Sequence, residues 1–120
     1  MTDGDRASVP SDEDRKLLVL ARGAMARAES ATGAAVRDID GRTYAGAAID
    51  RAALRLSALQ VALATALSSG APGFEAAVLI GRDDPAADPG LALLHELTPS
   101  APAYAAQPGS EILTPIEGAP

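Results

Sequence analysis

Residues 33–70 read GAAVRDIDGRTYAGAAIDRAALRLSALQVALATALSSG, and this stretch decides the fold. Near its start, Asp40-Gly41 is a dipeptide that readily supplies the positive φ angles of a tight hairpin turn. Short segments that read as strands, residues 33–39 and 42–48, lie on either side of it. The first half of the stretch therefore predicts two antiparallel strands.

The second half of the stretch predicts a helix. Asp50 stands where a helix N-cap is expected, and Gly70 stands where a helix commonly ends. Between them, residues 51–69 are rich in alanine and leucine and contain few polar positions. We therefore expect a long helix over residues 51–69 that is largely buried.

The segment before this stretch predicts another helix. Residues 11–14, Ser-Asp-Glu-Asp, resemble a capping box with acidic groups beside the helix N-terminus. Apolar residues then recur at spacings of three and four, as on one face of a helix that ends near Glu29.

The segment after the stretch alternates strands and a helix. Residues 74–80 form a continuous apolar run typical of a central strand, and residues 81–88 read as a loop. A second, shorter helix is predicted over residues 89–97, with further strands over residues 101–106 and 111–116. This order predicts an α/β fold of three layers, α/β/α, in which helices cover both faces of a mixed sheet of about five strands.

Composition predicts how the chain is divided. Residues 1–10 are polar and acidic and predict a disordered lead, residues 11–116 predict a single domain, and residues 117–120 predict a flexible tail. Alanine is abundant and only three residues are aromatic, so the core is thin and each buried side chain contributes little area. We therefore expect the chain to self-associate as a homo-oligomer.

Charge and cysteine content limit the classes of function. The formal net charge is −6, but Arg15 to Arg82 contains nine basic and five acidic residues, which leaves RNA open as a partner. The chain contains no cysteine, which excludes disulfides and thiolate metal sites. No apolar run approaches the roughly 20 residues that span a bilayer, and no leader pattern is seen, so we expect a cytoplasmic protein without a membrane partner.

The stretch resembles the first half of a cytidine deaminase. The family's small-residue first strand is similar to residues 33–36, its Asp-Gly hairpin to residues 40–46, and the turn after its metal-binding helix to residues 68–70. The resemblance implies the cytidine-deaminase-like fold. It also implies a zinc site, because zinc deaminases take ligands and a catalytic glutamate from the starts of two successive helices.

The chain departs from the family pattern where the chemistry would lie. The resemblance places Ser57 at the first metal ligand and Leu59 at the catalytic glutamate. Residues 85–90 stand where the second, cysteine-containing motif would be, and Asp50 aligns with an acidic residue that binds the ribose. We therefore expect no metal site, no bound zinc and no catalytic residue, with Asp50 as the only candidate ligand-binding residue.

Other candidate sites are weaker. His95, the single histidine, lies next to Glu96, and neighbouring residues point to different faces of a helix. Ser57 has no local base that would make it a nucleophile. Asp83, Asp84 and Asp88 lack the alternating spacing of a calcium loop, so we interpret them as a solvated acidic loop.

The sequence thus predicts a non-catalytic cytidine-deaminase-like protein that serves as a binding or assembly module for an unidentified protein partner. One alternative is an active cytidine deaminase or related nucleoside hydrolase with an atypical site, formed by Ser57, Asp50, His95 or the Asp83-Asp84 loop. A second alternative is an accessory protein for RNA or for a ribosome- or GTPase-linked complex, supported by the basic central segment.

Overall fold

The computed structural model describes residues 10–81 and 84–117. The predicted disordered lead (1–10) and flexible tail (117–120) therefore lie outside the described residues, except for Pro10 and Glu117. Within the two described ranges, no helix has both the length and the apolar character needed to cross a membrane.

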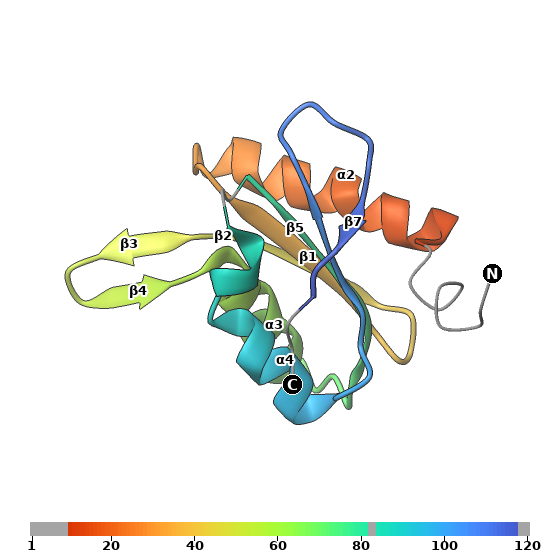
Figure 1. The fold of residues 1–120 in the computed structure, drawn as a ribbon. Coiled ribbons are helices and arrows are strands. Elements are labelled where there is room, and N and C mark those ends of the chain that lie inside the picture. Colours follow the sequence, from red (N-terminus) through yellow and green to blue (C-terminus); the bar gives the residue numbers. More distant parts are fainter. Residues whose placement is uncertain (1–9, 82–83, 118–120) are drawn as a thin grey trace.

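A mixed sheet of five strands in the order β2-β1-β5-β6-β7 forms the centre of the molecule (Figure 1). Its strands are β1 (Gly33–Asp38), β2 (Thr43–Ala47), β5 (Phe74–Ile80), β6 (Ala103–Ala106) and β7 (Thr114–Pro115). Strand β1 is antiparallel to both β2 and β5, β5 is parallel to β6, and β6 is antiparallel to β7. The predicted α/β fold with a mixed sheet of about five strands is confirmed.

Helices cover both faces of this sheet (Figure 1). Helix α2 (Asp12–Arg27) covers one face, while α3 (Ala58–Ser68) and α4 (Gly90–Leu97) cover the other. Because successive side chains of a strand point to opposite faces, Val78 and Ile80 of β5 pack in the cluster with α2, and Leu79 packs in the cluster with α3. The predicted three layers and the predicted central strand are therefore confirmed.

Local signals in the sequence account for α2 and for the β1–β2 hairpin. Ser11 caps α2 through the predicted capping box, in which its Oγ accepts a hydrogen bond from the Asp14 N–H at 3.1 Å. Gly41 has a φ of +86°, as the tight turn requires. The fully buried Asp38 holds this turn, because its Oδ1 accepts hydrogen bonds from the backbone N–H groups of Asp40 and Arg42.

The predicted helix over residues 51–69 is wrong in its first third. The chain instead forms a second hairpin from β3 (Ile49–Arg51) and β4 (Leu54–Leu56), and α3 begins only at Ala58. The physical reason is that Ser57 and Gln60 form a capping box, which starts the helix there. Asp50 is accordingly a strand residue and not an N-cap.

The other boundaries differ by smaller amounts. The predicted loop over residues 81–88 contains a short 3-10 helix, η1 (Pro85–Ala87), and α4 begins at Gly90, with Pro89 before it as the N-cap. The predicted strand over residues 111–116 shrinks to the two residues of β7. Proline lacks the N–H that extends a strand ladder, and Pro115 lies in this strand.

Helix α3 lies very close to β2 because β2 contains a glycine at the contact. A Cβ atom built on Gly46 would lie 2.6 Å from Cγ1 of Val61 and 2.9 Å from the backbone N of Ala62. Both neighbours belong to α3, and a backbone atom cannot move away without shifting the helix. The absence of a side chain at Gly46 thus sets how near the helix comes to the sheet.

We expect Gly46→Ala to reduce the free energy of unfolding by about 1–3 kcal/mol, because the added methyl overpacks this contact. Gly23→Ala is the matched control, since its Cβ would meet only the flexible end of Arg27 and alanine favours a helix interior by about 1 kcal/mol. Urea denaturation of both variants measures the difference. Equal stabilities would show that α3 does not depend on the glycine at position 46.

Candidate functional site

The start of α3 is the first part of the candidate site. The N–H of Gln60 donates to Ser57 Oγ at 3.1 Å, and the N–H of Ser57 donates to Gln60 Oε1 at 2.9 Å. Two free N–H groups at the helix start are thereby satisfied. The signal for this capping box, Ser followed three residues later by Gln, is present in the sequence and marks Ala58 as the first residue of the helix.

The start of α4 is the second part, and it lies against the first. Asp88 follows η1, and its carboxylate Oδ1 accepts hydrogen bonds from Ser57 Oγ at 2.5 Å and from the N–H of Gly90 at 2.7 Å. The first of these bonds joins residues that are 31 positions apart in the chain, whereas the second joins residues two positions apart. The three groups, Ser57, Asp88 and the N–H of Gly90, are called the Ser57–Asp88 junction below.

Asp88 is buried, with 3% of its surface exposed, so the interpretation of this residue as part of a solvated acidic loop is wrong. Asp84 is exposed and precedes η1, and Asp83 lies outside the described residues. The reason for the difference is that Pro85–Ala87 turns the chain inward, with the N–H of Asp88 donating to the Pro85 carbonyl at 3.1 Å.

The electrostatics of the junction come from one carboxylate and two helix ends. The N-termini of α3 and α4 both carry partial positive charge, which favours an anion beside them. Asp88 Oδ1 receives a donor from each of these ends. Oδ2 of Asp88 is buried and has no hydrogen-bond partner among the described residues.

Leu59, in the first turn of α3, fills the adjacent space. Its side chain is completely buried in the cluster formed with α4, where Leu94 is also completely buried. A Cβ atom on Gly90 would lie 2.7 Å from Cβ and Cγ of Leu59, so the start of α4 sits directly against this side chain. The space beside the junction is therefore closed by hydrocarbon.

The other candidate residues of the sequence have different neighbours. Asp50 lies in the β3–β4 hairpin, where its highly exposed carboxylate forms an ion pair with Arg55 at 3.2 Å. His95 lies in the last turn of α4, with Nε2 at 2.9 Å from the carbonyl oxygen of Ala101. Neither residue is a hydrogen-bond partner of Ser57 or Asp88 in the described part of the chain.

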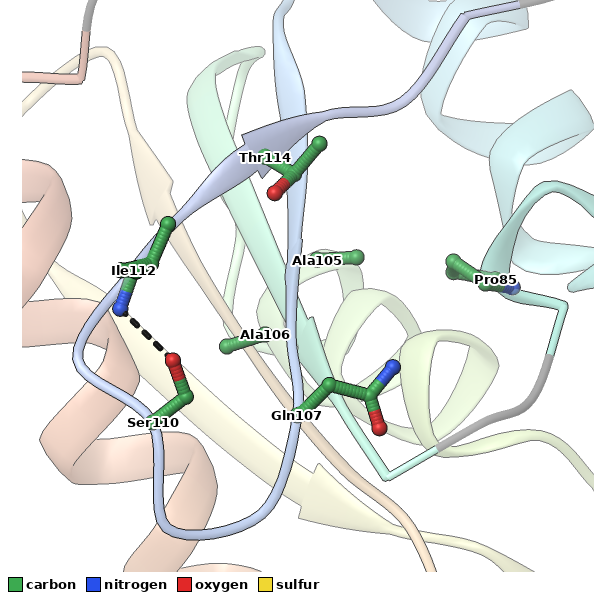
Figure 2. A pocket seen from close by; sticks show the side chains of 7 residues that line it. All are labelled: Pro85, Ala105, Ala106, Gln107, Ser110, Ile112 and Thr114. Carbon is green, nitrogen blue, oxygen red and sulfur yellow. Dashed lines mark hydrogen bonds between the residues drawn. The ribbon is translucent and has the colours of Figure 1, made fainter.

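A hollow of about 370 Å³ lies beside η1, between the loop that carries Asp88 and the β6–β7 segment (Figure 2). It is lined by Pro85, Ala105, Ala106, Gln107, Ser110, Ile112 and Thr114. Ser110 Oγ accepts a hydrogen bond from the Ile112 N–H at 3.0 Å, which holds the loop at one side of the hollow. The lining is mostly apolar, and neither Ser57 nor Asp88 belongs to it.

Comparison with known proteins places the chain in a family. A family model described as cytidine deaminase-like matches residues 10–110, whereas a search of curated proteins finds no match. The crystal structure of cytidine deaminase from Burkholderia pseudomallei is similar with a TM-score of 0.63 and 25% identity, covering 82% of this chain and 91% of that one.

Cytidine deaminase from Mycobacterium leprae is similar with a TM-score of 0.62, covering 73% of this chain and 83% of that one, and at 23% identity this likeness shows the fold alone. The family match extends over most of the sequence and includes β1, β2, α3 and α4. The chain therefore belongs to the cytidine deaminase-like family.

Proposed function

We propose that this chain is a non-catalytic member of the cytidine deaminase-like family and serves as a binding or assembly module. The observation that carries the proposal is the closed state of the region where α3 and α4 begin. Leu59 fills that region with hydrocarbon, and the Ser57–Asp88 junction uses its polar groups internally. A cytoplasmic location is part of the same proposal.

The available donor atoms do not fit a zinc site. Zinc in proteins is bound by thiolate, imidazole and carboxylate groups, usually three or four together. The junction supplies one carboxylate and one hydroxyl, and that hydroxyl already donates to Asp88 and accepts from Gln60. Among the described residues, no group of three His, Cys, Asp or Glu side chains could hold a metal ion.

The chain also lacks a side chain at position 59 that could transfer a proton. Deamination in zinc deaminases needs a glutamate that moves a proton between the activated water and the base. The resemblance places Leu59 there, and an alkyl side chain can neither accept nor donate a proton. The complete burial of Leu59 further supports a packing role.

Surface features support self-association. The β3–β4 hairpin projects from the body of the molecule (Figure 1), and Leu54 on it is 50% exposed. A two-stranded hairpin is marginally stable by itself in water, so a second copy packed on Leu54 would stabilise it. We therefore propose this hairpin as part of the surface that forms a homo-oligomer.

The basic central segment gives less support to RNA binding than its composition suggests. Among the basic residues of this segment that the structure describes, five form ion pairs with carboxylates: Arg15, Lys16, Arg22, Arg37 and Arg55. Paired cations are partly neutralised and attract phosphates less strongly. An assembly of protein subunits is therefore the proposal that we favour.

Zinc content and cytidine turnover test the absence of catalysis. We expect the purified chain to contain far less than one zinc per molecule and to show no turnover, because it lacks both the donor set and the proton carrier. Metal analysis and an absorbance assay measure these quantities, with an active cytidine deaminase assayed in parallel. Stoichiometric zinc, or a turnover that a chelator abolishes, would contradict the proposal.

Replacing Leu59 tests whether the region is closed. We expect Leu59→Glu to reduce the free energy of unfolding by about 3–5 kcal/mol, since it places a charge in a fully buried apolar position. Leu59→Met is the matched control and costs less than about 1.5 kcal/mol. If denaturation showed both variants to be equally stable, the position would be open to solvent and the closed-site argument would fail.

Sedimentation velocity tests the proposed assembly. We expect the chain to sediment as a dimer or larger species, and Leu54→Asp to shift it towards the monomer because a charge replaces exposed hydrocarbon on the hairpin. Val19→Asp is the matched control, since Val19 is also exposed but lies on α2. A wild-type monomer, or equal effects of the two variants, would contradict a role for the hairpin.

A further inference from the structure

The carboxylate of Asp88 contacts the starts of two helices at once. The Ser57 hydroxyl at the start of α3 and the Gly90 N–H at the start of α4 both donate to the same oxygen, Oδ1. Ser57 directly precedes α3 and Asp88 directly follows η1, so α3, β5 and η1 all lie between them in the chain. Their contact therefore fixes the position of one helix start relative to the other.

Ser57 does more than cap its helix. Ser11 at the start of α2 forms the same kind of capping box, and in both boxes the serine Oγ accepts from the N–H three residues later at 3.1 Å. Within the described part of the chain, only Ser57 of these two serines donates a hydrogen bond from its hydroxyl to a residue outside the box, namely Asp88. The bond to Asp88 is thus additional to what the helix start requires.

Burial makes this contact energetically important. A buried carboxylate is costly unless hydrogen bonds and nearby positive charge offset the loss of water. Here the two donors to Oδ1 and the positive ends of α3 and α4 provide that offset, while Oδ2 is buried without a hydrogen-bond partner among the described residues. Gly90 permits the approach, because a Cβ atom there would lie 3.0 Å from Asp88 Oδ1 and still closer to Leu59.

We propose that the Asp88 carboxylate takes over the structural task of a metal in this family, holding the starts of α3 and α4 together. In zinc deaminases the ligands come from the starts of two successive helices, so the metal joins them. In this chain the Ser57–Asp88 junction joins the same two places without a metal. The inference goes beyond the proposed function, because it concerns what holds the scaffold and does not depend on any binding partner.

A double-mutant cycle on the full chain tests the junction. The variants are Ser57→Ala, Asp88→Ala and their combination, unfolded by urea near neutral pH in buffer with and without EDTA. We expect each single substitution to favour unfolding, and the combination to exceed Asp88→Ala alone by only about fivefold, the effect of losing the Ser57 cap on the Gln60 N–H. The two residues should be coupled by about 10-fold or more in the unfolding equilibrium constant, as for a hydrogen bond to a charged group.

Ser11→Ala provides the matched control. It removes a capping serine with the same geometry and should change the unfolding constant by only about fivefold, the typical effect of a lost N-cap. Its effect should add to that of Asp88→Ala without coupling. If Ser57→Ala costs no more than Ser11→Ala and is also additive with Asp88→Ala, the inference is overturned.

Two further measurements keep the test decisive. If Asp88→Ala does not fold, Asp88→Asn replaces it in the cycle, because its amide oxygen still accepts from Ser57 and Gly90 and the coupling should be smaller but present. EDTA should leave the wild-type midpoint unchanged, and added zinc should not raise it. A midpoint that falls with EDTA and recovers with zinc would show that a metal holds the helices, whatever the outcome of the turnover assay.

Discussion

The close approach of small residues between the sheet and its helices is the constraint on which the rest of this structure depends. A Cβ atom on Gly33 would lie 2.3 Å from the carbonyl oxygen of Ala21 in α2, and one on Gly46 would lie 2.6 Å from Cγ1 of Val61 in α3. Alanine and glycine each contribute little dispersion energy and little buried apolar area. The stability of the fold therefore requires that the layers lie close together. At Gly90 the same close packing brings the start of α4 onto Leu59 and closes the candidate site.

The buried carboxylates of this thin core accept hydrogen bonds from nearby donors. Asp14 accepts from the Ser11 N–H and pairs with Arg37, and Asp38 accepts backbone N–H groups in the β1–β2 turn. Burial alone would lower the pKa of Arg37, but hydrogen bonds to Glu75 and Asp14 outweigh it and raise that pKa. Each acid is thus held by donors at a turn or a helix end.

Asp88 differs from these acids because it receives donors from two helices. Asp38 accepts backbone N–H groups close to it in sequence, and the distant donor of Asp14 is Arg37 on a strand, whereas the distant donor of Asp88 is the hydroxyl at the start of another helix. The region that would carry chemistry in a zinc deaminase thereby contains an internal polar contact and a buried leucine. This arrangement is the basis of the proposal that the chain is a non-catalytic member of its family.

Most of the architecture could be predicted from short-range signals. The Asp-Gly turn, the capping box at Ser11 and the apolar run of β5 all act within a few residues, and each formed as expected. The helix expected from residue 51 failed because the pairing of β3 with β4 overrides the helix preference of alanine and leucine there. The capping box of Ser57 and Gln60 was the local signal that distinguishes the two.

The sequence by itself determined the order of the central strands and of the helices that cover them, because periodicity, turn residues and caps are local properties, and its resemblance to a known family indicated the family. The tertiary structure alone decided that Asp88 is buried and bonded to Ser57. That contact requires β5 to run across the sheet and η1 to turn the chain back towards α3, and no pattern near residue 88 encodes the arrival of a distant hydroxyl. The physical reason that local patterns cannot predict the Ser57–Asp88 contact is that long-range packing brings the two helix starts together.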